Sequence, residues 1–241
     1  LVNKRVEAVL GDNKVSGVRL SGGEELKADM VIVGVGATPN TELAKKAGFQ
    51  IGTTRAIQVD RYMRTITDAD VFACGDCAEK FSFFSGRVSR LMLASIACTE
   101  ARIAGANLFN TRYANPGAIG VFSTIIGERA FGCAGLTEVM AKREGFDVVI
   151  SESTAPDRHP GSMPGAVSTK VKLIFSKDNG LLLGGGVSSG RGTAEITNII
   201  GACIQHRMTA YEVSLFQMGT HPALTASPFS CLFTYWLKFI Y

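Results

Sequence analysis

The 241-residue sequence predicts a chain of two parts, an α/β segment followed by an α+β domain. Two short apolar runs, Met30–Val33 and Val71–Cys74, each end at a glycine, which is typical of buried parallel strands. From Thr111 onward the pattern changes to strands joined by a hairpin turn, with helices after them. Hydrophobic residues make up 46% of the chain, so we expect a substantial core.

The first part is predicted to contain a strand at Arg5–Leu10 and, after Met30–Val33, a glycine-rich turn that includes Gly36. Thr41 is placed to cap a helix over 42–47, because a threonine side chain can accept a hydrogen bond from the first turn. Gly48 is expected to end that helix.

Residues Thr65–Cys77 carry the most informative motif. The predicted strand Val71–Cys74 is followed directly by Gly75 and Asp76. Gly75 has no Cβ, so a ligand can approach the backbone closely there. Asp76 follows the carboxyl end of the strand, where open α/β sheets bind ligands, and its carboxylate can accept hydrogen bonds from a polyol.

A helix is predicted over Ser89–Phe109, with Ser89 as its N-cap. The N-terminus of such a helix offers unpaired N–H groups and a partial positive charge. The alanines of this helix recur at three- and four-residue steps, so we expect one face of small residues packed against a sheet or a cofactor: Ala94, Ala97, Ala101 and Ala104.

The second part is predicted to place strands before helices. Thr137 and Gly145 are expected to bound the helix 138–144, and Asp178-Asn-Gly180 is a hairpin turn signal. Thr209 and Glu212 form a capping-box pattern. The remaining elements are strands at 119–126, 129–132, 148–150, 170–175 and 181–183, and helices at 193–206 and 209–217.

Four segments resemble one protein family. Thr65–Cys77 resembles the second flavin motif of the flavoproteins with two dinucleotide-binding domains. The segment 28–43 resembles the Val-Gly-x-x-Pro-Asn stretch of the pyridine nucleotide-disulfide oxidoreductases. The segments 127–131 and 135–138 are similar to the interface domain of the branch that contains NADH oxidase, coenzyme A-disulfide reductase and NADH peroxidase.

The resemblance implies a partial Rossmann-like segment followed by an α+β dimerisation domain. It assigns 1–45 to the end of the NAD(P)H-binding domain and 46–112 to the second segment of the FAD-binding domain. It assigns 113–228 to the interface domain. Residues 229–241 are an atypical aromatic tail, whose composition suits a docking strand or helix, a dimer contact, or a non-native ending from a reading-frame change. Neither of the family's two glycine-rich fingerprints nor its redox cysteine is present, so we expect the C-terminal half of an enzyme.

The resemblance also assigns cofactor-binding residues. Asp76 would hold the ribityl chain of FAD, Gly75 would allow close approach, and Gly36 would shape the nicotinamide side. The first turn of the predicted 89–109 helix would face the pyrimidine edge of the flavin: Leu91, Met92, Leu93 and Ala94. The cofactors implied are FAD and NAD(P)H, with no metal.

The resemblance implies a homodimer that passes hydride from NAD(P)H to FAD and on to oxygen, peroxide or a disulfide or polysulfide. The scattered cysteines, without a visible secretory signal, predict a reducing cytoplasmic location. Two alternatives remain open: a non-catalytic dimerisation fragment without cofactor, and a ferredoxin or rubredoxin reductase.

The net charge of the chain is +4 with the two signs well mixed, which gives nucleic-acid binding no support. No apolar stretch reaches membrane-spanning length.

The sequence contains six cysteines and three histidines. Cys74 and Cys77 have the spacing of a redox pair, but the negative charge of Asp76 between them opposes thiolate formation.

His221 precedes a proline near the C-terminus, as does the acid/base histidine of the related disulfide reductases. A base role and an ordinary loop position near a dimer interface both fit it. His159 lies in a long Pro- and Gly-rich loop of the kind that is often functional or mobile.

Overall fold

The computed structural model describes residues 1–227, so the predicted aromatic tail at 229–241 lies outside the described residues. Contacts divide the chain into two compact units, Leu1–Thr38 and the chain from Pro39 onward. Within residues 1–227, no helix is both long and apolar enough to cross a membrane.

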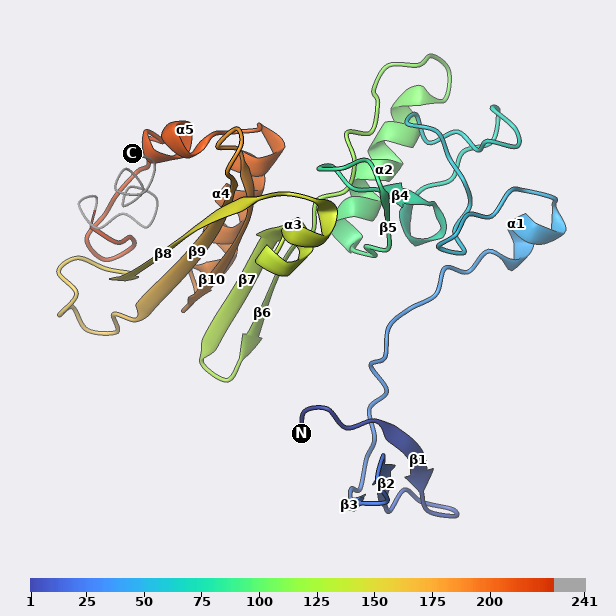
Figure 1. Ribbon diagram of the computed structural model, residues 1–241, viewed down its shortest axis with the longest axis horizontal. Helices are drawn as coiled ribbons and strands as arrows, with labels where there is room; N and C mark the ends of the chain where they lie inside the picture. The colour runs from blue at the N-terminus through green and yellow to red at the C-terminus, as the bar shows by residue number, and fades with distance from the viewer. Residues whose placement is uncertain (228–241) are drawn as a thin grey trace. The chain divides into compact units, whose positions relative to one another are not determined.

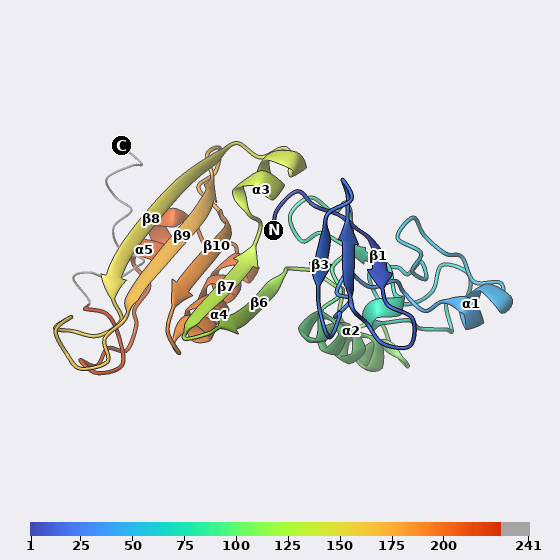
Figure 2. The ribbon, with the colours of Figure 1, turned by 90° about the horizontal axis from the view of Figure 1, so that it is seen from below.

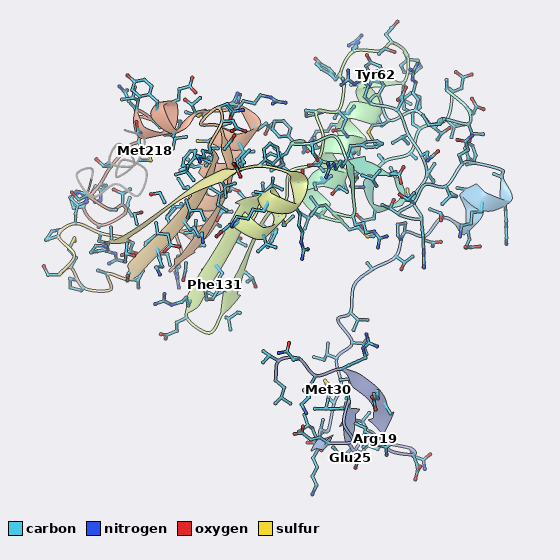
Figure 3. All side chains as sticks on the ribbon, in the orientation of Figure 1. Arg19, Glu25, Met30, Tyr62, Phe131 and Met218 are labelled. Atoms are coloured by element: carbon cyan, nitrogen blue, oxygen red, sulfur yellow. The ribbon has the colours of Figure 1, made fainter. Side chains whose placement is uncertain are left out.

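The first unit is a three-stranded antiparallel sheet in the order β1-β2-β3 (Figure 1). Its strands are β1 (Val6–Leu10), β2 (Gly17–Leu20) and β3 (Glu25–Lys27). The strand expected at Arg5–Leu10 is therefore confirmed. Arg19 and Glu25 face each other on β2 and β3, with the guanidinium Nη2 2.9 Å from Oε1 (Figure 3).

The predicted buried strand at Met30–Val33 is wrong. These residues form no regular element, and Met30 and Ile32 are 75% and 86% exposed. A strand of a parallel sheet is stabilised by hydrogen bonds to neighbours on either side. No other described segment pairs with residues 30–33, so these residues lack the backbone hydrogen bonds to a neighbouring strand that a sheet requires.

The second unit begins with a largely irregular segment that contains four short elements and one long helix. These are α1 (Glu42–Lys46), the single 3₁₀ turn η1 (Gly75–Cys77), the paired strands β4 (Lys80–Phe81) and β5 (Val88–Ser89), and the long helix α2 (Ala94–Asn107). Their shared apolar core is formed by Val59, Met63, Ala73, Ala78, Ile103 and Ala104. This core fixes the Gly75 turn against α2.

Two predictions for this region need correction. Val71–Cys74 is not a strand, since only Phe72 makes a bridge, and that bridge is antiparallel to Arg64. Thr41 is the N-cap residue of α1, but its side chain makes no cap bond and donates instead to the carbonyl of Arg55 at 3.0 Å. For Thr41, the difference arises because a carbonyl 14 residues away competes with the local cap bond.

The rest of the second unit is a five-stranded antiparallel sheet in the order β6-β7-β10-β9-β8 (Figures 1 and 2). Its strands are β6 (Val121–Ile126), β7 (Arg129–Gly135), β8 (Val148–Pro156), β9 (Ser168–Ser176) and β10 (Leu182–Ser189). All five were expected, although β7, β8, β9 and β10 are longer than their patterns indicated.

Helices cover both faces of this sheet. On one face α4 (Thr193–Gln205) packs against β6, β7 and β10, and α5 (Ala210–Ser214) joins the same core. On the other face α3 (Glu138–Glu144) covers Ile174 and Leu183. The close approach of α4 requires Gly132, because a Cβ there would lie 1.9 Å from the Thr197 hydroxyl.

The local signals for helix ends are confirmed in this domain. The Thr137 side chain accepts a hydrogen bond from the Met140 amide, and Gly145 ends α3 with φ +96°. Thr209 and Glu212 form the predicted capping box, although α5 is shorter than the predicted 209–217 helix.

Candidate functional site

The Gly75–Asp76 turn is the feature with the most specific geometry. Extended backbone at Cys74 leads into η1, and Gly75 is buried with φ +74°, a conformation that favours glycine. The Asp76 side chain is exposed. Within residues 1–227 its carboxylate makes no hydrogen bond or ion pair, so both oxygens remain available to a ligand.

Two buried side chains of opposite charge hold both backbone groups of Gly75. The Gly75 amide donates to Glu100 Oε2 at 2.8 Å. Lys80 Nζ donates to the Gly75 carbonyl at 2.5 Å and to the Ala78 carbonyl at 3.1 Å. We call Gly75, Lys80 and Glu100 the glycine clamp. It fixes the peptide that precedes Asp76 and therefore the direction in which that carboxylate is presented.

Lys80 and Glu100 also form an ion pair, with Nζ 3.3 Å from Oε2, and their side chains are only 3% and 2% exposed. Burial of these charges is costly unless they are paired and hydrogen-bonded. Burial raises the pKa of Glu100, although the neighbouring Lys80 and the Gly75 amide act in the opposite direction. Glu100 Oε1 has no hydrogen-bond partner among the described residues.

The sequence analysis missed both charged members of the clamp. One signal was available: Glu100 follows Ile96 by four residues and precedes Ile103 by three, so it lies on the apolar face of α2. A charged residue at that spacing predicts a buried, paired group. Lys80 gave no comparable signal, because its strand has only two residues.

The helix α2 begins at Ala94, so the prediction that it starts at Ser89 is wrong. Ser89 lies in β5, and Leu91, Met92 and Leu93 are half-buried residues that precede the helix, with Leu93 in the N-cap position.

The buried face of α2 is also not the predicted alanine stripe. It is formed by Ile96, Glu100, Ile103, Ala104 and Asn107, while Ala94 and Ala101 are exposed. Among the residues that the structure describes, no side chain caps the helix N-terminus, so its first N–H groups are free of side-chain partners there. The Gly75 turn packs directly against this helix, since a Cβ on Gly75 would lie 3.4 Å from Ala97 Cβ.

The other predicted cofactor residue, Gly36, belongs to the first unit. Its φ is +107°, and a Cβ at this position would meet open space. The backbone there has the conformation expected of a glycine turn.

His221 lies in an exposed turn near the end of the described chain. Its backbone amide donates to the Thr225 hydroxyl at 3.1 Å, and its ring Nδ1 accepts from the Ala223 amide at 3.2 Å. An imidazole that accepts at Nδ1 carries its proton on Nε2 when it is neutral. Within residues 1–227, no hydrogen bond or ion pair joins His221 to the glycine clamp.

Cys74 and Cys77 are half-buried free thiols. Cys77 Sγ donates to the Cys74 carbonyl at 3.3 Å. Burial raises the pKa of Cys74, and the neighbouring Cys77 and Glu100 raise it further. A raised pKa leaves little thiolate, which is the reactive form. That the pair has no redox role stays a prediction.

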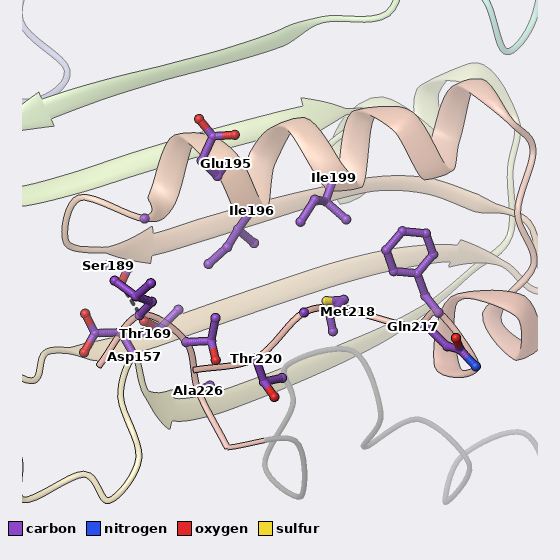
Figure 4. Close-up of a pocket in the computed structure, with 15 residues that line it drawn as sticks. Asp157, Thr169, Ser189, Glu195, Ile196, Ile199, Gln217, Met218, Thr220 and Ala226 are labelled. Atoms are coloured by element: carbon purple, nitrogen blue, oxygen red, sulfur yellow. Dashed lines mark hydrogen bonds between the residues drawn. The ribbon is translucent and has the colours of Figure 1, made fainter. Parts of the chain in front are cut away.

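A cavity of about 500 Å³ lies in the second unit, between α4, the β9–β10 surface and the segment 216–226 (Figure 4). Ile196 and Ile199 of α4 and Met218 form much of its apolar lining, and Asp157, Thr169 and Ser189 lie at one end. The residues on both sides of His221 therefore contribute one wall, namely Thr220, Leu224, Thr225 and Ala226.

The second unit thus combines a glycine-aspartate turn packed against α2 with a five-stranded antiparallel sheet that follows it. This arrangement agrees with the class of flavoproteins that the sequence resembles. Two descriptions of one family match the chain. Pyridine nucleotide-disulphide oxidoreductase matches residues 1–101, and the dimerisation domain of the same family matches residues 121–228. The chain belongs to the pyridine nucleotide-disulphide oxidoreductase family.

Individual relatives agree with this assignment. An NADH oxidase of Methanocaldococcus jannaschii is 30% identical over 225 residues, which cover 93% of this chain and 49% of the relative. A CoA-dependent NAD(P)H sulfur oxidoreductase of Pyrococcus furiosus is 35% identical over 163 residues, 66% of this chain and 36% of the relative.

Among solved structures, an NAD-dependent persulfide reductase from A. fulgidus superposes with a TM-score of 0.87 at 31% identity, covering 96% of this chain and 42% of that one. The chain thus spans about half the length of these relatives, or less.

Proposed function

We propose that this chain forms the C-terminal part of a homodimeric flavoprotein that passes hydride from NAD(P)H to FAD and on to oxygen, peroxide, or a disulfide or polysulfide. The glycine clamp carries the proposal. Two buried charged side chains hold the backbone of one glycine, and among the described residues the adjacent Asp76 carboxylate has no partner. Such support by buried side chains is typical of a turn that presents one group to a ligand.

The residues present fit FAD. Asp76 has two unused acceptor oxygens for the hydroxyls of the ribityl chain, and the uncapped N-terminus of α2 has free N–H donors for the pyrimidine edge. Leu91, Met92, Leu93 and Ala94 lead into that helix end, which supports their proposed contact with the flavin. Bound FAD would supply hydride acceptance and electron transfer, while the protein orients and polarises it.

The proposed acceptors follow the names of the relatives, one an NADH oxidase and two of them sulfur or persulfide reductases. In a reaction at sulfur, His221 would exchange protons with the substrate as acid or base. Its Nδ1 accepts the Ala223 amide within the turn, so Nε2 is the ring nitrogen that would exchange the proton. Gly36 would shape the nicotinamide side of the first unit.

A homodimer is supported by the match to the family's dimerisation domain over residues 121–228. A reducing, cytoplasmic location is supported by the cysteines, since all five that lie within residues 1–227 are free thiols. We retain the domain division at 1–45, 46–112 and 113–228 as part of this proposal.

The alternative of a dimerisation fragment without cofactor is supported by the match of residues 121–228 to the dimerisation domain. The match to the dimerisation domain disfavours a ferredoxin or rubredoxin reductase. Flavin binding by the chain itself separates the first two possibilities.

The test is an absorbance spectrum of the purified chain in the near-ultraviolet and visible range, with and without added FAD. We expect a bound-flavin spectrum for the wild type and roughly 10- to 100-fold weaker FAD binding for Asp76→Asn, because a hydrogen bond to a charged group contributes about 1.5–3 kcal/mol. Asp12→Asn, at an exposed position, is the matched control. A wild-type chain that stays colourless with excess FAD would favour the dimerisation fragment.

A further inference from the structure

His159 is a histidine that the proposed reaction does not use, and it contacts the turn that carries His221. The loop that contains it joins β8 to β9, 62 residues before His221 in the chain. The backbone amide of His159 donates to the Pro222 carbonyl at 2.9 Å. Its ring Nδ1 lies 3.0 Å from the Thr225 carbonyl. One residue therefore holds both sides of the His221 turn.

These two bonds anchor the turn to the loop between β8 and β9. Within the turn, the amides of Leu224 and Thr225 both donate to the His221 carbonyl at 3.0 Å. Met218 adds apolar packing against the core of the interface domain.

Thr225 links the two histidines. Its hydroxyl accepts from the His221 amide at 3.1 Å, and its carbonyl accepts from the His159 ring. A carbonyl can only accept, so the proton of a neutral His159 ring must lie on Nδ1. His221 accepts at Nδ1 from the Ala223 amide, so its proton lies on Nε2. The structure therefore requires opposite tautomers in the two rings.

We propose that His159 is a positioning residue that fixes the turn of His221 and thereby the direction in which His221 Nε2 is presented. The proposal rests on the acid/base role of His221 given above. His159 holds the turn from outside through Pro222 and Thr225, and Thr225 transmits this constraint to the His221 backbone. His159 itself does not touch substrate or cofactor.

The test uses nuclear magnetic resonance on the full chain, which is practical because the chain has only three histidines. Long-range ¹H–¹⁵N spectra at alkaline pH should show the Nδ1–H tautomer for His159 and the Nε2–H tautomer for His221. In His159→Ala, the Leu224 and Thr225 amides should exchange with solvent about five- to tenfold faster, as expected for one lost hydrogen bond.

His159→Asn is the conservative rescue, because an asparagine Nδ2 lies where the imidazole Nδ1 lay and can donate to the same carbonyl. We expect exchange of the two amides to return close to the wild-type rate. His206→Ala, at the end of α4, is the matched control and should leave both amides unchanged. Unchanged exchange in His159→Ala, or a His159 ring with the Nε2–H tautomer, would overturn the proposal.

Measurements of turnover distinguish the positioning role of His159 from the acid/base role of His221. In a polypeptide that reduces disulfides, His159→Ala should lower kcat with little change in KM, and His159→Asn should restore it. If His221→Gln leaves turnover unchanged while the exchange results hold, the acid/base role fails and the constraint on the turn stands. If His221→Gln abolishes turnover but His159→Ala does not loosen the turn, the positioning role of His159 fails.

Discussion

The glycine clamp and the His221 turn hold their functional groups in contrasting ways. The clamp is buried and uses two opposite charges that lie 3.3 Å apart. The His221 turn is exposed and depends on neutral hydrogen bonds, two of which come from His159. A buried charged network is costly to disturb, because a remaining partner is left unpaired in a dry environment. An exposed turn can open locally while the rest of the domain stays folded.

The largest expected effect comes from removing one charge of the clamp. Glu100→Ala leaves the Lys80 ammonium buried without its counter-ion, and we expect the free energy of unfolding to fall by about 3–5 kcal/mol. Urea denaturation of the chain measures this. Glu42→Gln breaks an exposed ion pair with Lys45 and is expected to change the unfolding free energy very little. Similar losses in the two variants would mean that the clamp is not the buried network described above.

The clamp should also make stability depend on pH in a defined direction. Burial raises the pKa of Glu100 above its ordinary value of 4.5, so the folded state binds this proton more tightly than the unfolded chain. The resulting stabilisation is complete below the unfolded pKa and is lost as the pH rises through the folded pKa.

The wild-type free energy of unfolding, minus that of Glu100→Gln, is therefore expected to fall as the pH rises above 4.5. The slope is at most about 1.4 kcal/mol per pH unit for one proton. Urea titrations at a series of pH values measure the difference. A difference that increases with pH would show that Lys80 and the Gly75 amide outweigh burial.

The smallest expected effect on global stability belongs to the His221 turn. Thr225→Val removes the hydroxyl that accepts from the His221 amide, but the turn is exposed, so we expect the free energy of unfolding to change by no more than about 0.5 kcal/mol. Exchange of the Leu224 and Thr225 amides should nevertheless be faster. A large global loss would contradict the view that this turn opens independently of the domain.

Local signals in the sequence were enough to place several elements. The caps at Thr137 and Thr209, the glycine that ends α3 and the hairpin turn at Asp178–Gly180 were all predicted and are present. Each depends on residues within a few positions of one another, so the backbone conformation they favour does not need the rest of the fold. The Gly75–Asp76 motif and the family could likewise be inferred from residue types and order.

Only the tertiary structure decided which groups are buried and paired. Lys80 and Glu100 are 20 residues apart, and His159 and Thr225 are 66 apart, so no short pattern links them. Apolar composition alone also misled at Met30–Val33 and Val71–Cys74, because a strand exists only where another strand completes its hydrogen bonds. The sequence by itself determined local turns, caps and family membership. Long-range packing decided the pairing of the glycine clamp and the anchoring of His221. It also decided that the two apolar runs, Met30–Val33 and Val71–Cys74, do not form strands.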